Sequence, residues 1–246
     1  MEKFEGETSN STNNRVRLTD SWFAKSELYD SCNEGPIVIT NNSNDELSFG
    51  GGGTNGAIVD YFFPDRSTIL CGLMKAGRQH RDNWHIYGGP LENASLLLGD
   101  DKGNEKKVDL VPHAPGSIWV SSLPIERRQS TRVSHIIHVV GPINNLEFAN
   151  GEDVKTARER ASRIVSAATK QILILADTKL GAGTCILSGI SAGIFARGSK
   201  EWTSAMYNSM NSAIREYTVE YSSSVMEIVL VGAWKEYIHS EKQQTH

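Results

Sequence analysis

The 246-residue chain has little of several features that would define its class at once. It contains only three cysteines, Cys32, Cys71 and Cys185, and no pair of them has the C-x-x-C spacing of a zinc or redox site. Scattered thiols do not form a disulfide framework either, so the sequence favours a reducing compartment. We therefore expect a cytoplasmic protein, in a host cytoplasm if it is an exported effector or a viral protein.

Long apolar runs and a basic excess are also missing. No stretch approaches the ~20 apolar residues of a membrane helix, and the polar first residues lack the apolar stretch of a signal peptide. The formal net charge of −4 argues against nucleic acid bound by bulk charge, although backbone amides can still hold a small anion. We expect a globular monomer with neither a membrane nor a nucleic-acid partner.

The apolar residues that are present follow two periodicities. Short β-branched runs predict buried strands at residues 36–39, 117–121, 135–140, 172–175, 184–187 and 226–231. Helical spacing predicts helices over residues 152–170, with Glu152 and Asp153 in the first turn, over 199–217, with Ser199 as N-cap, and over 234–239. The alternation predicts an α/β fold, a sheet with helices on both faces.

Composition divides the chain into unequal parts. Residues 1–14 are rich in Ser, Thr and Asn and predict a disordered tail, and residues 15–246 predict a single domain. Residues 65–112 have weak periodicity and many Gly, Asp, Lys and His residues, and the stretch is too long for a plain loop. We interpret it as an insertion built around loops, with room for one helix.

A glycine-rich loop follows the first predicted strand. Gly50 to Gly53, Thr54, Asn55 and Gly56 come just before an apolar helix start at Ala57. Ordering each glycine costs very roughly 1 kcal/mol relative to Ala, which is understandable where a ligand must touch the backbone. Strand, glycine loop and helix also present free amides to a phosphate. No Gly-Lys-Ser/Thr follows and no partner acid is identifiable, so neither a Walker A loop nor a dinucleotide fingerprint is indicated; a flexible glycine turn is the alternative.

Two more segments end in glycine at the carboxyl ends of predicted strands. One runs from His135 to Gly141-Pro142, and the other runs from Leu187 through Ser191-Ala192-Gly193-Ile194-Phe195. Glycine loops at such ends are what a ligand crevice at the edge of an open α/β sheet requires.

Together these segments resemble the macro domain family. The matching motifs are Gly51-Gly52-Gly53, Gly56-Ala57-Ile58, Val140-Gly141-Pro142 and Ser191-Ala192-Gly193-Ile194-Phe195. The resemblance runs from about Val16 to Tyr237, with residues 65–112 outside it. It implies a three-layer α/β/α fold with a mixed sheet, and ADP-ribose as the ligand.

The resemblance also implies a role for each matching residue. Asp20 would accept a hydrogen bond from the adenine amino group, and Trp234 would stack on the adenine. Gly51, Gly52, Gly53 and Thr54 would line the distal ribose and the neighbouring phosphate. Ser191, Ala192, Gly193, Ile194 and Phe195 would wrap the diphosphate, with Phe195 against the distal ribose.

The chain departs from the family pattern where chemistry would occur. The family's Asn-Ala-Ala-Asn segment reads Asn41-Asn42-Ser43-Asn44-Asp45, so Asn44 would contact the ribose, with Asp45 as the alternative. Asn55 stands where many family hydrolases carry Asp, and an amide cannot act as a base. Asp60 follows the loop, as the catalytic acid of poly(ADP-ribose) glycohydrolases follows a triple glycine, although their Gln-Glu-Glu is replaced by Asp60-Tyr61-Phe62.

These residues favour an ADP-ribosyl hydrolase that acts on ADP-ribosylated proteins. Water would attack C1″ of the distal ribose, and Asp60 would orient that water or protonate the leaving group. Asn44 and the glycine loop, which contains Asn55, would hold the ribose strained and correctly placed. Neither a metal nor a cofactor is expected, since Cys71, His80, His85 and His113 match no standard ligand spacing. A non-catalytic reader of ADP-ribosylation is the alternative, and hydrolysis of a small ADP-ribose derivative is a third.

Overall fold

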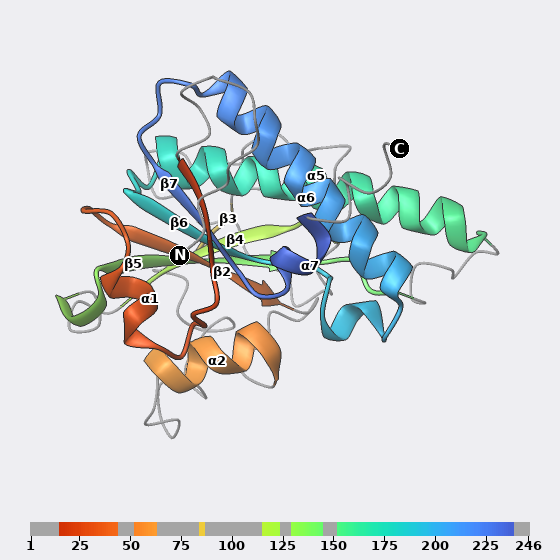
Figure 1. The fold of residues 1–246 in the computed structure, drawn as a ribbon, viewed down its shortest axis with the longest axis horizontal. Coiled ribbons are helices and arrows are strands. Elements are labelled where there is room, and N and C mark those ends of the chain that lie inside the picture. The colour runs from red at the N-terminus through yellow and green to blue at the C-terminus, as the bar shows by residue number, and fades with distance from the viewer. Residues whose placement is uncertain are drawn as a thin grey trace.

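The computed structural model of the protein describes residues 15–43, 52–62, 84–86, 115–123, 129–144 and 152–238. Its centre is a seven-stranded sheet with the strand order β1-β7-β6-β2-β5-β4-β3 (Figure 1). The strands are β1 (Val16–Thr19), β2 (Ile37–Ser43), β3 (Trp84–Ile86), β4 (Ile118–Ser122), β5 (Val133–Val140), β6 (Thr184–Ser188) and β7 (Glu227–Val231).

Strand direction collects the loops of interest at one edge of the sheet. β1, β7, β6, β2 and β5 are parallel neighbours, β4 pairs antiparallel with β5, and β3 pairs antiparallel with β4. The carboxyl ends of the parallel strands therefore lie side by side, and the loops that follow them share that edge. We call it the carboxyl edge, and the opposite one the amino edge.

Helices cover both faces of the sheet, which confirms the predicted fold class. Figure 1 shows the long helices α5 (Val154–Thr178) and α6 (Lys200–Glu220) on one side and α1 (Ser26–Asp30) and α2 (Gly53–Phe62) on the other. Side chains within a strand alternate between the two cores. Cys185 and Leu187 of β6 join the cluster under α5 and α6, and Ile186 between them joins the cluster under α1 and α2.

The predicted strand at residues 172–175 is wrong, because this run lies inside α5. Ile172, Leu173 and Leu175 are buried in the core that α5 shares with α6. No glycine or proline interrupts the chain between Val154 and Thr178, so nothing ends the helix where the prediction ended it. A helix in the middle of a core is apolar over more of its surface than an amphipathic pattern allows, and its apolar run imitates a buried strand.

The helix ends correct the prediction in detail. Asp153 lies before α5 and not in its first turn, and its carboxylate accepts hydrogen bonds from the amides of Lys155 at 2.9 Å and Thr156 at 3.1 Å. Ser199 caps α6 as predicted, accepting from the amide of Trp202 at 3.2 Å. The final helix is α7 (Trp234–Ile238), close to the predicted 234–239.

The sequence did not predict β1, α1, β3 or the early start of α2. β1 and α1 are short elements whose sequences gave no periodic signal, and α2 begins at Gly53, one turn before the predicted start at Ala57. Residues 84–86 of the predicted insertion form β3, an edge strand. The remainder of 65–112 and the predicted tail at 1–14 lie outside the described residues. In the described part of the chain, no helix is both long and apolar enough to span a bilayer.

Candidate functional site

The carboxyl edge brings together the three glycine-containing segments that the sequence singled out. α2 starts there, and a side-chain carbon added to Gly52 or Gly53 would lie 3.4 or 3.7 Å from the Cδ1 atom of Ile194. The glycine segment and the segment after β6 therefore face each other at close range. Gly53 has a φ of +65°, a left-handed conformation that favours glycine.

The start of α2 is suited to an anion. The first amides of a helix have no carbonyl acceptor within the helix, and the helix dipole adds partial positive charge there. Thr54, in this first turn, donates its hydroxyl to Ser188 Oγ at 3.3 Å, which fixes the helix start against the end of β6. Asn55, also in this turn, is half-buried. Gly51 and Asn44 lie outside the described residues.

Asn42 is a site residue that sequence reasoning did not single out. Its Nδ2 atom donates to Ser188 Oγ at 3.1 Å and to the Gly189 carbonyl at 2.9 Å, so it ties the end of β2 to the end of β6. Its Oδ1 atom is buried and has no partner among the described residues. The partners lie 146 and 147 residues away in the chain, so no local motif could have identified them.

The segment after β6 has an unusual backbone conformation at Ser191. Ser191 has a φ of +57° although it is not glycine, and it is 3% exposed. Two side chains of α6 hold this segment, since Trp202 Nε1 donates to the Ser191 carbonyl and Thr203 Oγ1 to the Ala192 carbonyl, each at 3.2 Å. Ser191 Oγ is buried and finds no hydrogen-bond partner in the described part of the chain.

The third segment at the carboxyl edge is Gly141-Pro142, which follows β5 and packs against the segment after β6. A side-chain carbon on Gly141 would come within 2.1 Å of Ser191 Oγ, so only glycine allows this approach. The backbone N–H of Asn144 donates to the Phe195 carbonyl at 2.9 Å, and its side-chain Nδ2 donates to the Ala196 carbonyl at 3.0 Å. Within the short 3-10 helix that follows, Ile194 is 69% exposed and Phe195 is half-buried.

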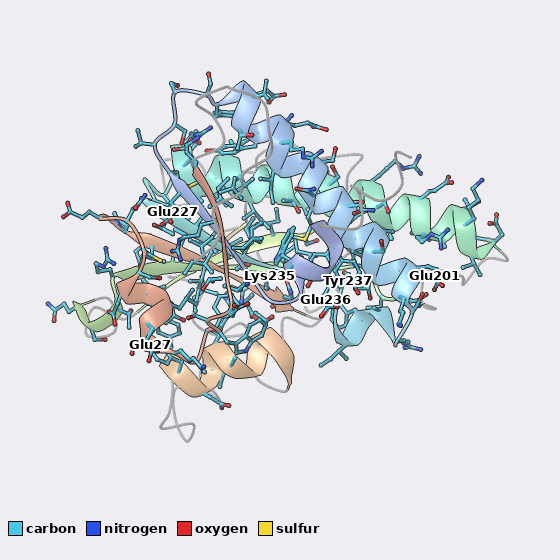
Figure 2. The ribbon with its side chains drawn as sticks, viewed as in Figure 1. Glu27, Glu201, Glu227, Lys235, Glu236 and Tyr237 are labelled. Carbon is cyan, nitrogen blue, oxygen red and sulfur yellow. The ribbon has the colours of Figure 1, made fainter. Side chains whose placement is uncertain are left out.

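At the β1 and β7 end of this edge, Asp20 forms an ion pair. Its carboxylate lies 2.9 Å from Lys235 Nζ of α7. In Figure 2, Lys235 lies on α7 with Glu236 and Tyr237, whereas Glu227 lies at the far end of β7. Lys235 was not identified from the sequence, because its partner is 215 residues away.

Trp234 does not present an open ring face for the predicted stacking role. It is 1% exposed, and Tyr207 packs edge-on against it with ring centroids 4.8 Å apart. A more accessible aromatic is Trp22, which is half-buried. A side-chain carbon on Gly232, where φ is +101°, would lie 3.4 Å from the Trp22 ring. Trp22 thus lies between the end of β1 and the turn that leads into α7.

Asp60, the predicted catalytic acid, is exposed on α2. Because α2 begins at Gly53, Asp60 lies about two helical turns, or about 10 Å, along the helix from the end that meets the site. Its backbone is thus farther from the carboxyl edge than a helix starting at Ala57 would have placed it.

A buried polar pair lies beneath the site. His138 of β5 is fully buried, and its Nδ1 atom lies 3.0 Å from Nδ2 of Asn41 on the neighbouring β2. Burial lowers the pKa of His138 to about 3, so the ring is neutral near pH 7. Within the described ranges no three His, Cys, Asp or Glu side chains cluster as a metal site would require. His80 and His113 lie outside these ranges.

Comparison with known proteins identifies the fold. No protein-family model and no curated protein matches the chain. Among solved structures, a macrodomain of Oceanobacillus iheyensis with ADP is 18% identical over 93% of this chain and 92% of that chain, with a TM-score of 0.54. A Trypanosoma brucei macrodomain in complex with ADP-ribose is 14% identical over 97% of this chain and 72% of that chain, also with a TM-score of 0.54.

At these identities the likeness establishes the architecture. The chain has the α/β macrodomain fold that the sequence predicted. The likeness of the glycine loop to poly(ADP-ribose) glycohydrolases and the role of each site residue remain predictions.

Proposed function

We propose that this protein binds ADP-ribose at the carboxyl edge of its sheet. The observation that carries the proposal is the convergence of the segments at Gly52–Gly53, Gly141–Asn144 and Ser188–Ala196, which lie far apart in the chain. The motifs of the first and third segments predicted contacts to the nucleotide, and the Val140-Gly141-Pro142 motif of the second was predicted to lie at the same crevice. The similar macrodomains bound to ADP and to ADP-ribose support the same ligand class.

Backbone dipoles explain how an acidic chain could hold a diphosphate. The net charge is −4, so attraction over the whole surface does not favour an anion. Amides at the start of α2 and in the segment after β6 supply local positive potential at fixed positions. The anchors from Trp202 and Thr203 hold the second segment in place before the ligand arrives, which lowers the ordering cost of binding.

Binding is tested by calorimetry with ADP-ribose on the full chain. Gly53→Val places a branched side chain in a left-handed conformation next to Ile194, and we expect at least a tenfold loss of affinity. Gly181→Val is the matched control, because Gly181 has a φ of +59°, has nothing within 4 Å of an added carbon and follows α5 at the amino edge. Equal affinities for the two variants would contradict the site.

The finer proposal is that the protein removes ADP-ribose from modified proteins. Water would attack C1″ of the distal ribose, the bond from C1″ to the carrier side chain would break, and the leaving group would take up a proton. Asn55 in the first turn of α2, together with Asn44, would orient the water. An acid for the leaving group would come from Asp60 or from Asp45 beside Asn44.

The placement of Asp60 favours the reader alternative over this scheme. A general acid must lie within hydrogen-bond reach of the atom it protonates, or one water away. Asp60 is separated from the start of α2 by about 10 Å along the axis. A protein that binds ADP-ribose tightly without cleaving it needs no acid at this position.

A release assay separates the two proposals. The protein is incubated with substrates ADP-ribosylated through Glu/Asp, Arg or Ser, and the freed label is measured. Release from any linkage that is lost in Gly53→Val supports the hydrolase, and tight binding without release supports the reader. If release occurs and Asp60→Ala abolishes it while ADP-ribose affinity is kept, Asp60 reaches the reaction centre despite its position on α2.

A further inference from the structure

A buried tyrosine of α6 contacts both the segment after β6 and the turn after β7. Tyr207 is 6% exposed, and its hydroxyl oxygen accepts a hydrogen bond from the backbone N–H of Ala233. A side-chain carbon on Gly189 would lie 2.6 Å from the same oxygen, and one on Gly232 would lie 3.7 Å from it. Because β6 and β7 are parallel neighbours, this one hydroxyl lies where their two following segments begin.

The position of this hydroxyl is fixed by the rings around it. Tyr237 of α7, labelled in Figure 2, stacks on the Tyr207 ring with centroids 4.6 Å apart, and Trp234 packs edge-on at 4.8 Å. Burial raises the pKa of Tyr207 to about 12, so the hydroxyl is uncharged near pH 7. Ala233 is exposed, so the bond from its amide ties a surface turn to a rigid interior group.

The length of the proposed ligand makes both segments relevant to binding. The converging glycine-containing segments follow β5, β2 and β6, which together span roughly 10 Å of the carboxyl edge. ADP-ribose carries a base, two sugars and two phosphates in a row and is longer than that span. Beyond β6 the next strand is β7, which is parallel, whereas β4 on the other side is antiparallel and its following loop leaves from the amino edge. The extension therefore fits best over the turn after β7.

We propose that Tyr207 is a positioning residue that holds the segment after β6 and the turn after β7 at a fixed spacing for a ligand that spans both. The buried side chain acts through the backbone of these two segments. Holding them together before the ligand arrives lowers the ordering cost of binding. The inference rests on the proposed binding of ADP-ribose and adds a residue on which the alignment of that site depends.

Tyr207→Phe tests the inference on the full chain, because it keeps the ring and removes only the hydroxyl. ADP-ribose affinity, measured by calorimetry, should fall by about fivefold, the effect of losing one hydrogen bond. Adenosine and ribose 5-phosphate are each too short to span both segments, and their affinities, measured by NMR titration, should change much less. A site that was merely damaged would lose affinity for all three ligands alike.

Tyr217→Phe is the matched control. Tyr217 is also buried on α6 and stacks on a second tyrosine, Tyr221, but its hydroxyl donates to Asp177 at 2.6 Å near the amino edge. This variant should keep the ADP-ribose affinity of the unmodified protein.

A second measurement addresses the hydrogen bond itself. Hydrogen exchange at the Ala233 amide of the free protein should be faster in Tyr207→Phe than in Tyr217→Phe. Equal exchange rates, an unchanged ADP-ribose affinity in Tyr207→Phe, or equal losses for ADP-ribose and the two fragments would each overturn the role of Tyr207 while leaving the binding site intact. If the unmodified protein does not bind ADP-ribose, the proposed function itself fails and this inference fails with it.

Discussion

At the scale of single residues, two glycines allow equally close contacts at opposite edges of the sheet. A side-chain carbon on Gly141 would lie 2.1 Å from Ser191 Oγ, and one on Gly183 would lie 2.2 Å from the Glu34 carbonyl oxygen. Both contacts force a local shift, so we expect Gly141→Ala and Gly183→Ala each to lower the free energy of unfolding by about 1–3 kcal/mol. Urea denaturation measures this loss.

Only Gly141→Ala should change the affinity for ADP-ribose. Gly141→Ala displaces the segment at Ser191 and should weaken ADP-ribose binding at least tenfold, whereas Gly183→Ala at the amino edge should leave the affinity unchanged. Calorimetry below the unfolding transition compares the two. Similar losses of affinity would mean that binding follows global stability and not the contact between Gly141 and Ser191.

His138 predicts a pH dependence of stability. Its pKa is lowered from 6.5 to about 3 by burial, so between these values the unfolded chain binds a proton that the folded chain does not. Stability is therefore fully present above pH 6.5 and falls as the pH drops toward 3, by up to about 1.4 kcal/mol per pH unit.

Urea denaturation between pH 5 and 6.5, above most carboxyl titrations, checks this expectation. His138→Gln should flatten the pH dependence, and His135→Gln, a half-buried histidine on the same strand, should not. If both variants retain the slope of the unmodified protein, another group is responsible for it.

At the scale of elements, the start of α6 supports the segment after β6. Ser199 caps the helix, and Thr203 one turn later donates to the Ala192 carbonyl. We expect Ser199→Ala to lower the free energy of unfolding by about 1 kcal/mol, and Ser199→Asp to retain most of it because aspartate also accepts the capping bond. A thermal melt in which both variants match the unmodified protein would show that the cap contributes nothing.

The elements also show what local sequence can and cannot predict. β2, β4, β5, β6, β7 and α6 could be predicted locally, because each strand is a short β-branched apolar run and α6 has helical spacing after its cap Ser199. α5 was predicted eight residues short of Thr178, since buried Ile172 and Leu173 are compatible with a strand or a central helix. The absence of glycine and proline before Gly181 favours the helix over a strand, and the prediction did not use it.

The candidate site also contains residues that local sequence could predict and residues that it could not. Segments whose proposed ligand contacts come from their own backbone, such as Gly52–Gly53 and Ser191–Phe195, were identified from motifs. Residues whose role is a contact between distant segments, Asn42 and Lys235, were missed because their partners are 146 and 215 residues away. Trp234 was assigned from its position after a strand, and only packing against Tyr207 reveals that its ring is covered.

At the scale of the whole molecule, the proposed binding site and a buried ion-pair cluster that supports the fold lie at opposite edges of the sheet. At the amino edge, Arg17 Nε lies 2.7 Å from Glu227 Oε1, with both side chains about 10% exposed. The second oxygen of Glu227 accepts from the Asn33 amide at 3.1 Å and from Thr184 Oγ1 at 3.3 Å. This cluster joins β1, β6 and β7 to the end of α1.

We expect Glu227→Ala to lower the free energy of unfolding by roughly 3 kcal/mol, because Arg17 would be left buried without its counter-ion. ADP-ribose affinity, measured while the protein is folded, should stay the same. Replacing both partners with Met should cost less than the single change, since no charge is then buried alone. A single variant as stable as the original would show that water reaches Arg17.

The short strand β3 has a consequence for how this protein can be shortened. Its three residues pair with β4 and lie at the end of the sheet, so they cover a backbone edge whose amides and carbonyls would otherwise be open to another molecule. A version trimmed of residues 65–112 would lose that cover together with the insertion. We expect β4 of one molecule to pair with β4 of another, so that the trimmed protein aggregates unless residues 84–86 are kept.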